Sequence, residues 1–172
     1  KPRNKKKPPD AGLVPAPGYT VWVRSTEGVT KDGSDLVSTW ADKSGNGLNF
    51  SKLDTGGAHN DREPVFRASN ANLNGLPSID MDKDEEDGGA METADNSALN
   101  VAGTGGFCAY AVLNINNFSN FSFVMTRTNG SSWTRGWGVF YYNGNYRFFL
   151  SWNTPSKYVE LSNVSNTTSP YI

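Results

Sequence analysis

The sequence predicts an all-β, antiparallel fold, and three observations lead to this prediction. The 172-residue chain is rich in Gly, Asn, Ser and Thr, which favour turns and strand edges. Aromatic residues make up 12% of it, enough to build a core of packed rings. No helical periodicity extends beyond one or two turns. We therefore expect short strands joined by tight turns and arranged as a two-sheet β-sandwich.

The first half of the chain is expected to form four short strands. Alternating β-branched and aromatic residues predict the first over residues 19–24 (YTVWVR). The second is expected over residues 36–42, and the Asn-Gly of the following turn at residues 44–47 suits a positive φ. Two further strands are predicted over residues 64–67 and 77–81, the latter after another Asn-Gly turn.

The second half contains the most apolar segments. Residues 107–115 (FCAYAVLNI) are typical of a central strand buried on both faces, and Cys108 within it is expected to be a buried, inert thiol. Residues 118–127 predict another strand. The clearest local pattern follows, because residues 137–142 (WGVFYY) and 146–152 (YRFFLSW) flank an Asn-Gly turn and predict a β-hairpin.

A set of short motifs between residues 19 and 115 carries a resemblance to a known family. They are Tyr-Thr-Val-Trp-Val-Arg at 19–24, Glu-Gly-Val-Thr at 27–30, Val-Ser-Thr-Trp-Ala-Asp-Lys-Ser-Gly-Asn-Gly at 37–47, and shorter pieces at 64–66, 73–77 and 79–82. In this pattern the chain resembles laminin-G-like domains of the concanavalin A-like lectin/glucanase superfamily. The Trp-Ala-Asp-x-Ser-Gly-Asn-Gly run resembles phage and bacterial members in particular. The resemblance implies an antiparallel two-sheet jelly roll, and it implies no ligand by itself.

The resemblance also bears on the extent of the domain. We expect a basic, proline-rich arm over residues 1–17 and a laminin-G-like domain over residues 18–172. Domains of this kind usually continue with further strands after the 137–152 hairpin, whereas this sequence stops at residue 172 in what looks like the start of a strand. We expect either a truncated sequence or a partner that supplies the missing strands, and we favour truncation.

The arm differs sharply in charge from the rest of the chain. Its five prolines are incompatible with a helix or a central strand, so it is either a linker or an anchor that docks on an acidic partner. The anchoring residues would be Lys1, Arg3, Lys5, Lys6 and Lys7. The remaining residues are net acidic, so we expect no nucleic acid to bind the folded domain. No apolar stretch is long enough for membrane insertion.

Catalysis is not expected. The single histidine, His59, lies in a polar loop, and no nucleophile-elbow sequence accompanies it. The acidic run at residues 80–87 lacks the Glu-x-Asp-x-x-Glu spacing of retaining glucanases, whose two working carboxyls must lie about 5–5.5 Å apart. Residues 82–89 include no apolar side chain, so burial would not raise a carboxyl pKa there. A glucanase-type glycoside hydrolase is therefore the weakest of the alternatives.

The same acidic run has two interpretations, a solvated turn or a calcium site at the sandwich rim. An EF-hand loop is excluded because Glu85 occupies the position that needs Gly and Met91 occupies the last ligand position. Ca²⁺ is the only cofactor that the sequence suggests. A looser site for it would draw on Asp82, Asp84, Glu86 and Asp87.

The aromatic hairpin supplies the candidate sugar site. Alternation places Trp137 and Tyr141 on one face of the first strand, and Phe140 and Tyr142 on the other. One face must fill the core, and the other would expose rings that stack on sugars. Alternatively, most of the rings belong to the core or to a subunit interface. The candidate glycan-contacting residues are Trp133, Arg135 and Tyr142.

Two non-enzymatic functions fit these features. The first is a structural or adhesion module on the surface of a viral (phage) particle, which contacts other virion proteins or its own copies as a homo-oligomer. Such a module would bind cell-surface glycans weakly and gain strength through multivalency. The alternative is a carbohydrate-binding module of a bacterial secreted or cell-surface protein.

Overall fold

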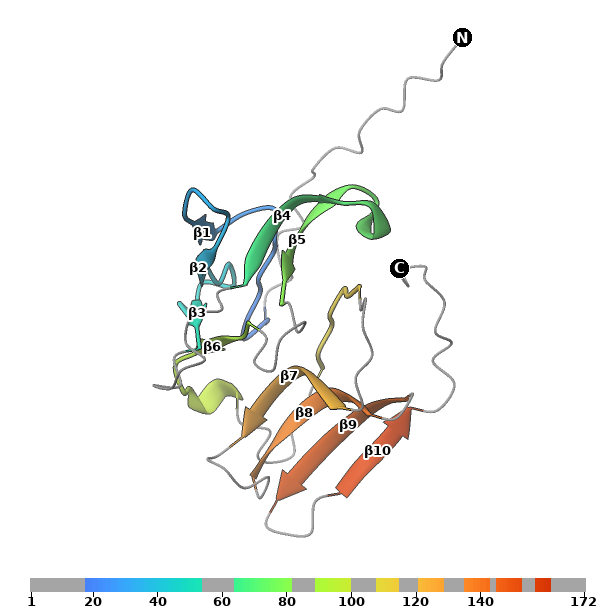
Figure 1. The fold of residues 1–172 in the computed structure, drawn as a ribbon. Helices are drawn as coiled ribbons and strands as arrows, with labels where there is room; N and C mark the ends of the chain where they lie inside the picture. The colour runs from blue at the N-terminus through green and yellow to red at the C-terminus, as the bar shows by residue number, and fades with distance from the viewer. Residues whose placement is uncertain are drawn as a thin grey trace.

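A computed structural model describes the chain over residues 18–53, 64–81, 89–99 and 108–114, and over four strands between residues 121 and 161. The regular elements in these residues are β-strands and two short 3₁₀ turns, and every strand pairing is antiparallel. This confirms the predicted all-β, antiparallel class. The described strands form two four-stranded sheets and one two-stranded ribbon (Figure 1). No helix among the described residues is long and apolar enough to cross a membrane.

The first sheet is built mainly from the amino-terminal third of the chain. Its strand order is β1-β2-β3-β6, with bounds Val29–Lys31, Val37–Trp40, Phe50–Lys52 and Met91–Thr93. β2 lies within the predicted segment 36–42, and its Val37 is fully buried. Leu48, in the turn before β3, is also almost fully buried. The sequence prediction for this strand is therefore confirmed.

The two-stranded ribbon pairs β4 (Val65–Asn70) with β5 (Leu76–Asp80). A 3₁₀ turn (Ala71–Leu73) connects them, followed by Asn74 and Gly75 with φ of 55° and 77°. These positive values are what an Asn-Gly turn provides. Both predicted strands and the turn between them are confirmed.

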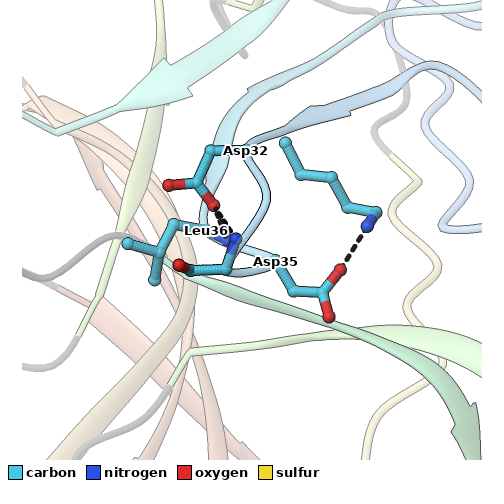
Figure 2. A network of polar contacts seen from close by, with 5 residues as sticks. Asp32, Asp35 and Leu36 are labelled. Carbon is cyan, nitrogen blue, oxygen red and sulfur yellow. Dashed lines mark hydrogen bonds and ion pairs between the residues drawn. The ribbon is translucent and has the colours of Figure 1, made fainter.

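A tight turn between β1 and β2 contacts the ribbon through a backbone hydrogen bond. Figure 2 shows the polar contacts of Asp32 and Asp35 within this turn. The Asp32 carboxylate accepts hydrogen bonds from the N–H groups of Ser34 (2.8 Å) and Leu36 (2.9 Å). Asp35, with φ of 67°, is ion paired with Lys31, and its carbonyl accepts the Phe66 N–H at 2.8 Å. The turn therefore presents backbone groups to β4 in a fixed geometry.

Gly28, just before β1, has no room for a side chain. Its φ is +73°, and an added Cβ would lie 3.0 Å from Ala41 Cβ and 2.8 Å from the end of Lys43. We expect Gly28→Ala to lower the free energy of unfolding by about 2 kcal/mol, through backbone strain and this crowding. Urea denaturation would measure it. Gly33→Ala is the control, because nothing lies within 4 Å of a Cβ there. Equal effects of the two substitutions would contradict the expectation.

The second sheet contains the aromatic hairpin. Its order is β10-β9-β8-β7, with bounds Lys157–Leu161, Asn145–Trp152, Arg135–Tyr142 and Phe121–Thr128. Tyr142 pairs with Asn145, so β8 and β9 are joined by a two-residue Asn-Gly loop. The predicted hairpin and the predicted strand within residues 118–127 are both confirmed. Figure 1 shows this sheet as a layer of its own below the first half of the chain.

β8 is covered on both faces along its centre. The neighbouring rings of Phe140 and Tyr141 point to opposite faces and are only 6% and 4% exposed, respectively. The expectation that one face would expose its aromatic rings therefore holds for Tyr142, which is 40% exposed, and is wrong for Phe140. Phe140 lies inside β8, whereas Tyr142 is its last residue, next to the hairpin turn.

Residues 95–99 connect the two four-stranded sheets. This segment follows β6 and contains the 3₁₀ turn Ser97–Leu99. Leu99 accepts a hydrogen bond from the indole Nε1 of Trp137 at 2.9 Å. The Arg127 guanidinium on β7 contacts the Asp95 carboxylate at 2.6 Å. A single short segment thus contacts both β7 and β8.

Two strand predictions are wrong. Residues 19–24 form no ladder, and only Arg24 makes an isolated bridge, to Glu27. Within the predicted strand 107–115, residues 108–114 belong to no strand and are largely exposed, with Tyr110 at 77%. Cys108 is likewise exposed, not buried. Apolar composition makes a strand only where a neighbouring strand supplies hydrogen bonds, and no described strand pairs with residues 108–114.

Candidate functional site

The Trp-Ala-Asp-Lys-Ser-Gly-Asn-Gly run folds into a turn around the Asp42 carboxylate. Its Oδ1 accepts the N–H groups of Trp22 and Ser44, both at 2.9 Å. Its Oδ2 accepts the Ser44 hydroxyl at 2.7 Å and the Leu48 N–H at 3.1 Å. Both oxygens are therefore engaged by the chain itself, and this carboxylate has a structural role.

The same turn explains why residues 19–24 form no strand. The side-chain amide of Asn46 donates to the carbonyls of Tyr19 (3.1 Å) and Thr20 (3.0 Å). The Lys43 N–H donates to the Trp22 carbonyl at 2.6 Å, and the rings of Tyr19 and Trp22 lie 5.4 Å apart. Side chains of the turn, together with the Lys43 N–H, thus satisfy backbone groups that a neighbouring strand would otherwise bond.

The electrostatics of Asp42 follow from these contacts. Partial burial alone would raise its pKa, but the hydrogen bonds from Trp22, Ser44 and Leu48 outweigh that effect and lower the pKa below its ordinary value. The folded state therefore binds the Asp42 proton more weakly than the unfolded state does. The stability from this carboxylate is fully present above its unfolded-state pKa and is lost as pH falls through the folded-state pKa.

We expect this contribution to be measurable by acid titration. Unfolding free energies of the wild type and of Asp42→Asn, measured in urea at a series of acidic pH values, should differ most near neutrality and converge towards low pH. The convergence is expected because protonation removes from the wild type the charge that the variant lacks throughout. A constant difference across the whole acidic range would contradict this assignment.

Tyr142 is the predicted sugar-contacting residue that the structure describes best. It ends β8, immediately before the hairpin loop. The guanidinium carbon of Arg147, on β9, lies 4.8 Å from the centroid of its ring, a cation–π geometry. The pair arises because register sets Arg147 opposite Phe140, one diagonal step from Tyr142 on the same face. The arrangement holds an exposed ring in place and puts a planar set of donors beside it.

The two predicted glycan-contacting residues that lie in described strands, Arg135 and Tyr142, are at opposite ends of β8. Arg135 pairs with Trp152 at one end of β8, and Tyr142 pairs with Asn145 at the other. An eight-residue strand separates its end residues by about 24 Å at the usual rise per residue. Trp133 lies outside the described residues. A small sugar at Tyr142 would therefore be too far away to contact Arg135.

Several other predicted residues lie outside the described part of the chain. These are His59, the calcium candidates Asp82, Asp84, Glu86 and Asp87, and the anchoring residues Lys1, Arg3, Lys5, Lys6 and Lys7. Within the described residues, no group of three or more His, Cys, Asp or Glu side chains could hold a metal ion.

The sequence did not predict the roles of two residues, Arg147 beside Tyr142 and Asp42 in the turn. Alternation puts Arg147 and Phe149 on one face of their strand, but the contact of Arg147 with Tyr142 becomes visible only once the hairpin register is fixed. The sequence predicts Asp42 as the end of a strand, although an Asp two residues before a Ser is typical of a turn closed by a side-chain-to-backbone hydrogen bond.

Comparison of the chain with protein-family models, with curated proteins and with solved structures finds no match.

Proposed function

We propose that this protein is a non-enzymatic adhesion module that binds glycans through the ring of Tyr142. The single observation that carries the proposal is the Tyr142–Arg147 pair, an exposed aromatic ring fixed by a cation at the tip of a hairpin. Aromatic rings stack on the apolar faces of sugars, and a guanidinium provides several fixed donors for sugar hydroxyls. In this proposal the sheets belong to a laminin-G-like jelly roll, as the Trp-Ala-Asp-x-Ser-Gly-Asn-Gly motif suggests.

The proposal also includes the setting in which the module works. We place it on the surface of a viral particle, attached by the basic arm and present in several copies, so that weak glycan contacts add up through multivalency. The resemblance to phage and bacterial members and the charge of residues 1–7 support this setting. The alternative is a carbohydrate-binding module of a bacterial secreted or cell-surface protein.

Glycan binding is tested by substituting the tyrosine. The wild type is first screened on a glycan array, and the strongest ligand is then titrated against variants by calorimetry. Tyr142→Ala is expected to weaken binding about tenfold, the effect of losing roughly 1.4 kcal/mol of ring stacking. Tyr110→Ala is the matched control, since that ring is also exposed but lies outside the second sheet, and it should bind like the wild type.

The same titrations locate the site along β8. Arg147→Lys keeps the charge but loses the planar guanidinium, and it is expected to weaken binding by a smaller factor than Tyr142→Ala does. If Tyr142→Ala binds normally while Trp133→Ala does not, the sugar contacts Trp133 and the proposed role of Tyr142 is overturned. Binding of no glycan by the wild type would overturn the adhesion proposal.

The particle setting is tested by fractionating native source material by size and locating the chain by peptide mass spectrometry. We expect it to migrate with a multi-megadalton particle, and removal of residues 1–7 should release it. A free or cell-wall-bound species would favour the bacterial alternative.

A further inference from the structure

The chain contains four Asn-Gly dipeptides, the pairs most prone to spontaneous deamidation because Gly does not shield its backbone nitrogen. They begin at Asn46, Asn74, Asn129 and Asn143. The first two lie wholly within the described residues, and both asparagines are exposed but differ in the hydrogen bonds of their side chains. Comparing them therefore shows how the fold changes the susceptibility of an Asn-Gly pair to deamidation.

Asn46 is exposed as well, but its side-chain amide makes several hydrogen bonds. Its Nδ2 donates to the carbonyls of Tyr19 and Thr20 and to the Ser44 hydroxyl, at 3.0–3.1 Å. This nitrogen is the atom that deamidation expels, so the reaction would have to break all three hydrogen bonds. The Asn46 N–H also donates to the Ser44 hydroxyl oxygen at 3.2 Å, which fixes the backbone next to the amide.

Asn74 is exposed, and its side chain makes no hydrogen bond within the described residues. It sits in the left-handed region, with φ of 55° and ψ of 30°. Gly75 is not crowded, because an added Cβ would make only an ordinary van der Waals contact, with the Ser69 hydroxyl oxygen at 3.7 Å. The Gly75 N–H donates to the Asn70 carbonyl at 2.9 Å, and this single hydrogen bond is the restraint that the reaction must break.

We propose that Asn74 is a modification site, converted spontaneously to aspartate and isoaspartate in the folded protein, while the fold protects Asn46. The Gly75 backbone nitrogen, losing its proton to base, attacks Cγ of Asn74 and closes a five-membered succinimide as the side-chain nitrogen leaves as ammonia. Water then opens the ring at either carbonyl. No oxidant or cofactor takes part, and the net change is the gain of water and the loss of ammonia.

The isoaspartate product would alter the β4–β5 ribbon. It inserts an extra carbon into the backbone at a turn that needs two successive residues with positive φ. The hydrogen bond from Gly75 to Asn70 would shift, and the pairing of Asn70 with Leu76 would shift with it. The new carboxylate also adds a negative charge to the tip of the ribbon.

The proposal is tested by ageing the full chain at mildly alkaline pH and digesting it with trypsin. Asn46 then lies in the peptide 44–52 and Asn74 in the peptide 68–83, and fragmentation assigns the mass gain to one residue. We expect conversion at Asn74 to be at least about tenfold faster than at Asn46, because the reaction at Asn74 has to break two fewer hydrogen bonds.

Two further samples show whether the fold causes the difference. In concentrated urea both dipeptides should react at similar rates, and Ser44→Ala, which removes one acceptor, should speed conversion at Asn46 in the folded protein. Asn74→Gln is the matched control and should abolish the mass gain in the peptide 68–83 at that position. Conversion of Asn46 as fast as Asn74 in the folded chain, or an unchanged difference in urea, would overturn the proposal.

Discussion

Replacement of Trp137 by alanine is expected to lower the free energy of unfolding by about 3–5 kcal/mol, the usual cost of emptying a large aromatic site in a core. Trp137 is almost fully buried on β8, an inner strand of the second sheet. It also joins that sheet to residues 95–99 through its indole N–H, which donates to Leu99 at 2.9 Å. The loss therefore combines a cavity with an unsatisfied carbonyl. Urea denaturation followed by fluorescence or circular dichroism would measure it.

Trp137→Phe separates the two contributions. Phenylalanine keeps most of the buried ring and removes the donor to Leu99, so we expect a loss of about 1–2 kcal/mol from the hydrogen bond and the smaller ring. If alanine and phenylalanine proved equally harmful, the hydrogen bond rather than the packing would dominate. If neither variant changed the free energy of unfolding, the Trp137 side chain would not be part of the core.

Asp42→Ala is expected to cost about 3 kcal/mol, although Asp42 lies nearer the surface. Its carboxylate accepts four hydrogen bonds from three residues. A hydrogen bond to a charged group contributes about 1.5–3 kcal/mol, and bonds that share one acceptor do not add fully. Removal leaves three backbone N–H groups without their acceptor, and one of them, that of Trp22, helps to hold residues 19–22 to the turn. Thermal and urea unfolding would both report the loss.

Asp32→Ala provides the comparison for this prediction. Asp32 also accepts two backbone N–H groups within a turn, but it is exposed, so water can replace the lost acceptor. We expect a cost of about 1 kcal/mol, typical of losing a cap-like hydrogen bond. Equal losses for the two aspartates would show that Asp42 acts as an ordinary turn residue and does not hold the amino-terminal segment.

Local sequence patterns predicted the hairpin and the ribbon well, and the reason is physical. In β8 and β9 the alternation, the Asn-Gly dipeptide and the strand lengths all refer to residues that are close in sequence. β4 and β5 are joined by a similarly local turn. Such elements need no knowledge of distant partners, so their pattern suffices.

The failures concern segments whose partners are distant in sequence. Residues 19–24 alternate like a strand, but their backbone groups bond to side chains about twenty residues later, which alternation does not reveal. Residues 108–114 have the composition of a buried strand, yet composition does not supply a neighbouring strand. Both errors have the same cause. Alternation and composition report local properties, and they do not show which groups form hydrogen bonds with the backbone N–H and C=O groups.

The candidate site was predictable in part. Tyr142 followed from its position in the hairpin, whereas the contact with Arg147 depends on cross-strand register. Arg135 follows the loop that precedes the hairpin, and Tyr142 precedes the hairpin turn, so the sequence does not tell how far apart they lie. The ladder extends β8 over the whole interval and thereby separates them.

The attachment of residues 19–22 has a mechanical consequence. Tension that enters the domain at Gly18 reaches the Asn46 amide before it reaches any strand ladder. The next bonds to carry the load are those from Trp22 and to its carbonyl, in the turn around Asp42. The hydrogen bonds of residues 19–22 with the turn are therefore the first to break under tension, and they lie outside the sheets. They can form again after the tension ends, while both four-stranded sheets stay folded.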